Sequence, residues 1–151
     1  MIRVWRQVKG FTLIEVLLIL AILGLIGGLA IPFYQSFQVT SELENTTKEI
    51  TQTIRRAQIT AMSSEGLSDH GIHFAGQQYI LFRGAIYNPA DIYNESFDLS
   101  PSLSVSTGGN DDIIFSSVSG LPNVEATITI NTNNGRSNSI TINGLGVPNV
   151  N

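Results

Sequence analysis

A charge-free stretch near the N-terminus constrains this chain more than any other feature. No residue from 16 to 41 is charged, and the ten residues before Phe11 contain three bases and no acid. A hydrocarbon core of about 30 Å needs about 20 apolar residues in a helix. The 23 residues of 11–33 include only two polar side chains, Thr12 and Glu15. The sequence therefore predicts a transmembrane helix over 11–33, with its basic end on the cytoplasmic side.

Two ordinary kinds of signal are consistent with this pattern. A signal anchor would keep the whole segment as a membrane tether. A cleavable secretory signal would use 16–26 as its apolar region and Gly28-Leu29-Ala30 as a small-x-small cleavage site. The two kinds differ in whether the apolar segment stays on the mature protein.

The residues at the start of the apolar run point to a third kind of signal. They read Gly10-Phe11-Thr12-Leu13-Ile14-Glu15-Val16. This heptapeptide resembles the cleavage and methylation motif of type IV pilins and type II secretion pseudopilins. The resemblance implies that a prepilin peptidase cuts between Gly10 and Phe11, which removes the basic leader 1–10. It also implies that Phe11 is then N-methylated and that the apolar helix is retained.

Glu15 is the one acid within the apolar segment. A carboxylate at the centre of a membrane helix costs about 2.5–3.5 kcal/mol, and an ordinary secretory signal has no reason to carry one. One interpretation is that Glu15 lies close enough to Phe11 to reach the interface. The resemblance implies another, in which Glu15 pairs with the N-terminal amine of a neighbouring subunit during assembly, within a bundle of low dielectric constant.

A flexible segment is predicted near the end of the apolar run. Pro32 removes a backbone donor and kinks a helix, and Gly24, Gly27 and Gly28 weaken the turns before it. Pro32 lies 21 residues after Phe11, where the pilin resemblance implies a proline. Gly24 and Gly28 also form a GxxxG pair that permits close helix contact, although small residues are common in membrane helices.

An amphipathic helix is predicted over 34–65. Apolar residues recur there every three or four positions, and charged side chains fall mostly off that stripe. The stripe consists of Val39, Leu43, Thr47, Ile50, Ile54, Ala57 and Ala61.

The remainder, 66–151, is predicted to be a β-rich globular head. Its β-branched residues and turn residues favour short strands. The expected strands are 71–75, 78–82, 103–106, 112–115, 124–131 and 139–143, with 84–87 as an extension of the second and 88–102 as a loop. The predicted fold class is α+β, with a long N-terminal helix packed on an antiparallel sheet or a small sandwich.

The pattern of the head resembles the GspH/FimT group of minor pilins and pseudopilins. It consists of a long helix followed by strand 72–74, a strand at 112–115 and a closing segment at 140–146. Some members of that group take up DNA through basic residues. Here 66–151 contains only Arg83 and Arg136 as basic residues, so no DNA binding is expected.

No set of residues predicts catalysis, a metal site or a cofactor. The chain has no cysteine, which excludes disulfides and thiolate chemistry. His70 and His73 are the only histidines, with Asp69 adjacent, and a metal would need further ligands. The loop acids Asp91, Asp98, Asp111 and Asp112 lack EF-hand spacing. No phosphate loop or serine nucleophile motif occurs.

The sequence thus predicts a non-enzymatic filament subunit, with a minor pilin or pseudopilin as the first interpretation. The resemblance implies three kinds of partner, namely other pilins, prepilin peptidase and an inner-membrane assembly platform with its ATPase. It places the protein first in the cytoplasmic membrane with the head outside, then in a filament.

Two other classes of protein are alternatives to a filament subunit. The main alternative is a secreted or membrane-tethered β-rich binding module, and the discriminating observation is whether 11–30 persists in the mature protein. An extracytoplasmic hydrolase has no supporting set of residues.

Overall fold

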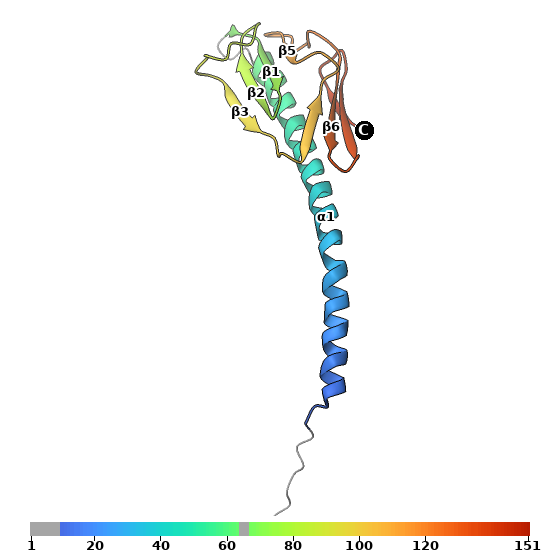
Figure 1. Ribbon diagram of the computed structural model, residues 1–151. Helices are drawn as coiled ribbons and strands as arrows, with labels where there is room; N and C mark the ends of the chain where they lie inside the picture. The colour runs from blue at the N-terminus through green and yellow to red at the C-terminus, as the bar shows by residue number, and fades with distance from the viewer. Residues whose placement is uncertain (1–9, 64–66) are drawn as a thin grey trace, which may run out of the picture. The chain divides into compact units, whose positions relative to one another are not determined.

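The structure is a computed structural model that describes residues 10–63 and 67–151. Within the long helix, the side chains of residues 29–33 and 35 also lie outside the description. The chain divides into two compact units, Met1–Gln38 and Val39–Asn151. The second, here called the C-terminal unit, contains the end of the helix and all strands that the structure describes (Figure 1).

One helix, α1 (Leu13–Met62), accounts for 50 residues. It runs without interruption through the three glycines and Pro32. The predicted helices at 11–33 and 34–65 are thus parts of one element, and residues 64–66 lie outside the described part.

The hydroxyls of the buried threonines on α1 donate hydrogen bonds to the helix backbone. Thr47, Thr51 and Thr53 donate to the carbonyls four residues earlier, at 2.6, 2.7 and 3.0 Å, which explains how a polar residue can lie on the apolar stripe.

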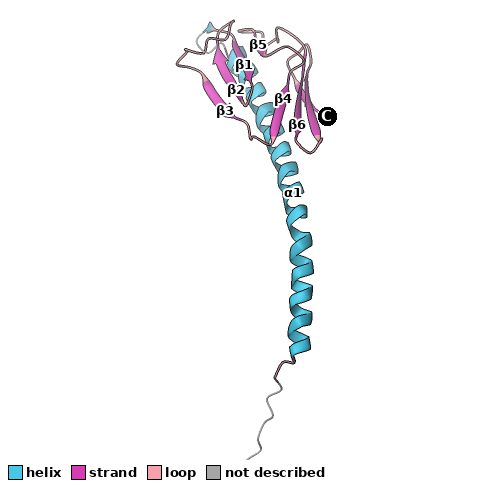
Figure 2. Ribbon diagram, in the orientation of Figure 1, coloured by secondary structure: helices cyan, strands magenta, loops and turns pink. Residues whose placement is uncertain are grey.

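The strands form two antiparallel four-stranded sheets (Figure 2). The first sheet has the order β3-β2-β1-β5, and the second has the order β4-β6-β7-β8. The strands of the first are β1 (His70–Ala75), β2 (Gln78–Arg83), β3 (Glu95–Asp98) and β5 (Asp112–Phe115). Those of the second are β4 (Leu103–Ser106), β6 (Ala126–Thr132), β7 (Ser137–Ile142) and β8 (Pro148–Val150).

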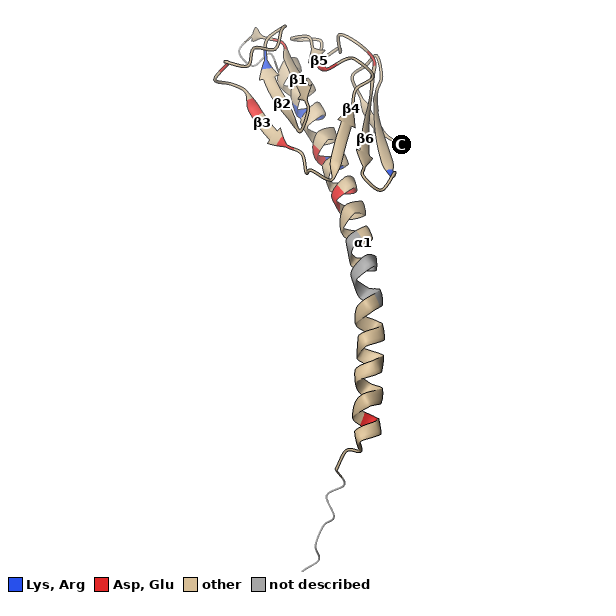
Figure 3. Cartoon of the chain, viewed as in Figure 1, with Lys and Arg blue, Asp and Glu red and all other residues tan. Residues whose placement is uncertain are grey.

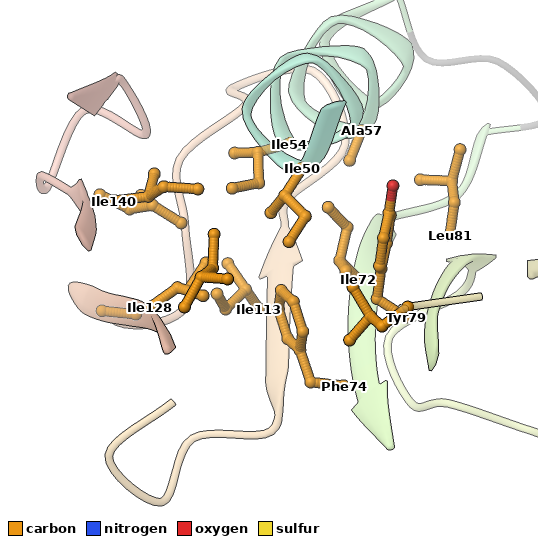
Figure 4. Close-up of a cluster of buried hydrophobic side chains, with 14 of the residues drawn as sticks. Ile50, Ile54, Ala57, Ile72, Phe74, Tyr79, Leu81, Ile113, Ile128 and Ile140 are labelled. Carbon is orange, nitrogen blue, oxygen red and sulfur yellow. The ribbon is translucent and has the colours of Figure 1, made fainter. Parts of the chain in front are cut away.

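The core lies between the end of α1 and the two sheets. Figure 4 shows Ile50, Ile54 and Ala57 of α1 directed toward side chains of both sheets. Alternate residues of the strands complete this cluster, among them Ile72, Tyr79, Ile113, Ile128 and Ile140. The predicted stripe is therefore confirmed from Leu43 onward, since its members are buried.

The outer face of the first sheet carries a second, smaller packing arrangement. Ile80 and Phe82 are buried there, and Tyr87 from the β2–β3 connection packs edge-on against Phe82, with ring centroids 5.4 Å apart. A Cβ added at Gly71 would lie 2.7 Å from the Phe82 ring. A glycine at this position is what lets the ring lie across β1.

The α+β fold class is confirmed, and the strands of the head form two sheets. Three details of the prediction were wrong. Residues 84–87 do not extend β2, because Gly84 has a φ of 122° and turns the chain away. Strand β3 lies within the predicted loop 88–102, and β8 was not predicted at all.

Candidate assembly site at the start of the long helix

Thr12 caps α1 just before its first residue. Its side-chain oxygen accepts a hydrogen bond from the Glu15 backbone N–H at 3.3 Å, and its carbonyl accepts one from the Val16 N–H at 3.2 Å. This is the first half of a capping box, in which a threonine precedes a glutamate by three residues. The flanking residues, Phe11 and Val16, are both apolar, as a hydrophobic staple requires. The helix therefore begins two residues after Phe11.

Glu15 lies in the first turn of α1 and is exposed. A carboxylate in the first turn interacts favourably with the partial positive charge of the helix N-terminus. The residues one turn further along, Leu18 and Ile19, are 61% and 44% exposed. One acid is thus surrounded by uncovered apolar surface.

Apolar side chains are exposed around the whole circumference of the first half of α1. A helix that is apolar on every face requires an apolar environment, such as lipid or other helices. Figure 3 shows the described part of this half as uncharged except near its start. The exposed side chains are Leu13, Ile14, Val16, Leu17, Leu18, Ile19, Leu20, Ile22, Leu23, Leu25 and Ile26.

A transmembrane helix is predicted over 11–33, and the described part of the chain can be compared with that prediction. Among the residues that the structure describes, no helix combines the length and apolar character needed to cross a membrane.

The predicted flexible segment lies inside α1. A Cβ added at Gly24, Gly27 or Gly28 would have no neighbour within 4 Å. These glycines therefore make no close contact within the chain itself, and space beside them is open to a partner helix. The side chain of Pro32 is outside the described residues, so its kink stays a prediction.

The histidines do not converge on one site. His73 Nδ1 lies 2.7 Å from Asp112 Oδ1, and its ring stacks on Tyr87 with centroids 4.0 Å apart. His70 is buried, and its Nδ1 donates to the Ser68 carbonyl at 3.1 Å. The Asp69 carboxylate accepts instead from the Ser117 N–H. Within the described ranges, no group of three or more His, Asp or Glu side chains is arranged to hold a metal ion.

Two ionisable groups of the C-terminal unit are perturbed by their surroundings. Burial, and then the negative charge of Glu49, raises the pKa of Tyr79 to about 12. Hydrogen bonds from Ser100 and Ser102 hold the pKa of Glu42 below its usual value. Tyr79 belongs to β2 and Glu42 to α1, and neither lies near Glu15 in the sequence.

Comparison with known proteins supports the motif at the helix start. Residues 5–31 match the family described as the prokaryotic N-terminal methylation motif, which is the signature of type IV pilins and pseudopilins. The match includes Gly10, Phe11 and Glu15. No curated protein and no solved structure matches the chain.

The motif match, which covers residues 5–31, supports one class of protein. The chain carries the signal of a type IV pilin-like protein or pseudopilin that prepilin peptidase processes, and such motifs mark structural subunits. The same motif indicates attachment to the membrane followed by a place in a filament. The resemblance of the head to the GspH/FimT group stays a prediction.

The capping role of Thr12 was not predicted from the sequence. Thr12 was noted only as a polar interruption of the apolar run. The spacing of Thr12 and Glu15, the Thr-x-x-Glu of a capping box, was the signal that identifies it.

Proposed function

We propose that this protein is a non-enzymatic minor subunit of a type IV pilus-like or type II secretion pseudopilus filament. The observation that carries the proposal is the first half of α1, where apolar side chains are exposed on every face around one carboxylate. A surface of this kind is satisfied when it packs against identical or similar helices.

Cleavage after Gly10 would create a new amine at Phe11, directly before the Thr12 cap. An α-amine has a pKa near 7.7–8.0, and N-methylation leaves it able to carry a proton. The amine and the Glu15 carboxylate are then opposite charges at the start of one helix. We propose that each Glu15 pairs with the amine of a neighbouring subunit.

This pairing would make the filament more favourable than the membrane for the helix. Lipid tails are as apolar as leucine side chains, so the hydrophobic effect does little to move a helix from membrane to filament. An uncompensated carboxylate in an apolar environment is costly, whereas a paired one is much less so. Glu15 therefore favours the filament, where a partner amine is present.

The proposal places the subunit first in the cytoplasmic membrane, with its head outside, and then in a filament. The partners that follow from it are other pilins or pseudopilins, prepilin peptidase, and the inner-membrane platform with its ATPase. The acidic balance after Gly10, twelve acids against five bases, argues against a nucleic-acid partner.

The decisive experiment is intact-mass measurement and N-terminal sequencing of the protein from membranes of cells that contain prepilin peptidase. The expected mature chain begins with N-methylated Phe11. A Gly10→Glu variant should keep residues 1–10, whereas Ala30→Leu, which spoils the secretory cleavage site, should be processed normally.

The opposite result would support the binding-module alternative. If the mature chain begins at Ile31 and Ala30→Leu blocks cleavage, the apolar helix is lost. The filament proposal would then be wrong.

A further inference from the structure

A pocket of about 270 Å³ lies in the C-terminal unit, between the last turns of α1 and one end of the first sheet. Strand register brings its walls together. His70 pairs with Arg83, and Leu81 pairs with Glu95, so these side chains share the face that is directed toward α1. Phe82 and Tyr93 also line the pocket, and Arg56 and Thr60, one turn apart on α1, complete the lining.

Arg83 presents an oriented guanidinium in this pocket. Its central carbon lies 3.6 Å from the centroid of the Tyr93 ring, a cation–π arrangement. Stacking on the ring fixes the plane of the guanidinium and leaves its N–H donors at the edge. Among the described residues, no hydrogen bond or ion pair engages those donors.

Arg56 already holds a carboxylate at the same pocket. Its Nη1 and Nη2 atoms lie 2.9 and 2.8 Å from the two oxygens of Glu95, a bidentate pair. The side chains are 58% and 45% exposed, and ion pairs this exposed contribute little to stability. Glu95 can therefore be displaced by a competing acid.

The charge of the pocket differs from that of the rest of the unit. Arg56 and Arg83 against Glu95 give the lining a net charge of +1. Residues 39–151 as a whole carry eleven acids against five bases. The positive pocket is thus a local exception in an acidic body, as Figure 3 indicates by blue segments on α1 and β2 beside red on β3.

We propose that this pocket binds a carboxylate group, with Arg83 as the principal donor and Arg56 as the second. The pocket is smaller than the usual range of about 300–1,000 Å³ for small-molecule sites, so it fits a small acid or one acidic side chain. These are two sources of the same ligand chemistry. The proposal does not depend on filament assembly.

A single carboxylate fits better than a phosphate. The lining has a net charge of only +1 and includes Glu95, which repels a dianion more strongly than a monoanion. The planar fork of arginine matches the two oxygens of a carboxylate.

The test uses the full chain in detergent micelles, labelled with ¹⁵N-arginine. Sodium acetate, sodium propionate and sodium phosphate are titrated at constant ionic strength, which NaCl maintains. For each carboxylate, we expect saturable shifts of the Arg83 and Arg56 Nε signals. The two signals should give the same dissociation constant. The Arg55 signal should not move, since Arg55 lies outside the pocket.

Variants distinguish carboxylate binding at this site from general attraction of anions to positive charge. Arg83→Gln should weaken carboxylate binding about tenfold or more, the loss expected for a hydrogen bond to a charged group. Glu95→Gln should tighten it, because the internal competitor is removed. Arg55→Gln is the matched control, with the same charge change on the same helix, and should bind as the wild type does. Arg83→Lys keeps the charge without the planar fork and should also weaken binding, which covers the case that Arg83→Gln does not fold.

Two tripeptides with blocked termini distinguish an acidic side chain of a partner from a small free acid as the source of the carboxylate. Gly-Glu-Gly binding more tightly than acetate, with Gly-Gln-Gly inactive, assigns the site to an acidic side chain of a partner. Propionate binding more tightly than the peptide assigns it to a small free acid. The proposal is overturned if no carboxylate gives a saturable shift, if phosphate binds more tightly than every carboxylate, or if Arg55→Gln loses as much binding as Arg83→Gln.

Discussion

Glu15 is the residue on which the assembly proposal depends most directly. Glu15→Gln keeps the size of the side chain and its place in the first turn but removes the charge. Breaking a buried ion pair costs about 3–5 kcal/mol, so incorporation into filaments should fall about a hundredfold or more while processing stays normal. The measurement is the ratio of variant protein in sheared filaments to that in membranes.

Ile14→Ala is the control for this prediction. Ile14 is the neighbour of Glu15 and is 74% exposed, but it carries no charge. Its truncation should affect incorporation far less than Glu15→Gln. Wild-type incorporation of Glu15→Gln would contradict the pairing role.

Glu42 gives the C-terminal unit a dependence on pH. Ser102 donates to Glu42 Oε2 at 2.7 Å, and hydrogen bonds from Ser100 and Ser102 lower the pKa of Glu42 from 4.5. Because the folded pKa is the lower one, this stabilisation is complete above the unfolded pKa and is lost as pH falls through the folded value.

The corresponding variant is Glu42→Gln. Its free energy of unfolding should depend less on pH than that of the wild type as the pH falls below 4.5. Urea denaturation of the full chain in detergent, repeated at several pH values, measures this. Glu44→Gln, an exposed position on the same helix, should keep the wild-type slope, and an equal change in both variants would refute the role of Glu42.

At the scale of elements, the buried stripe of α1 determines how the helix packs on the sheets. Ile54 is 0% exposed, whereas Ile59, five residues later on the same helix, is 65% exposed. Ile54→Ala should lower the free energy of unfolding by about 2–5 kcal/mol, because it leaves a cavity. Ile59→Ala should change it by less than about 0.5 kcal/mol. Urea denaturation followed by circular dichroism compares them, and similar losses would show that the stripe is not the packed face.

The same elements show what the sequence could and could not predict. The stripe was predictable because helical periodicity directly reflects burial. Strand β3 was not, because Phe97 is the one apolar residue among its four, and its pairing with β2 comes from distant contacts. Strand β8 has three residues and begins with Pro148, too short for any alternation to be visible.

Prediction of the candidate site was also uneven. Gly10, Phe11 and Glu15 could be proposed because the motif is local and is read from consecutive residues. The pocket around Arg83 was not found, because it combines α1, β1, β2, β3 and the segment before β3. Only the strand register, which the sequence does not reveal, brings those residues to one face.

At the scale of the whole molecule, the two compact units have opposite surface properties. In the N-terminal unit, the described side chains of residues 13–26 are apolar and exposed apart from Glu15 and the small residues. The core residues, from Leu43 to Ile142, all belong to the C-terminal unit. Solubility and stability are therefore determined by different parts of the chain.

This separation predicts the behaviour of a truncated protein. A chain of residues 39–151 retains the whole core, so it should remain in solution without detergent and unfold in one cooperative transition. It lacks Phe11 and Glu15, and it should therefore fail to enter filaments even when wild-type subunits are present. Analytical ultracentrifugation and thermal unfolding test the first expectation, and co-expression followed by filament purification tests the second.

The matched control is the full-length chain with the same tag, which should co-purify with the filaments. If the truncated chain co-purifies equally well, assembly depends on the head, and the role proposed here for the apolar helix is wrong.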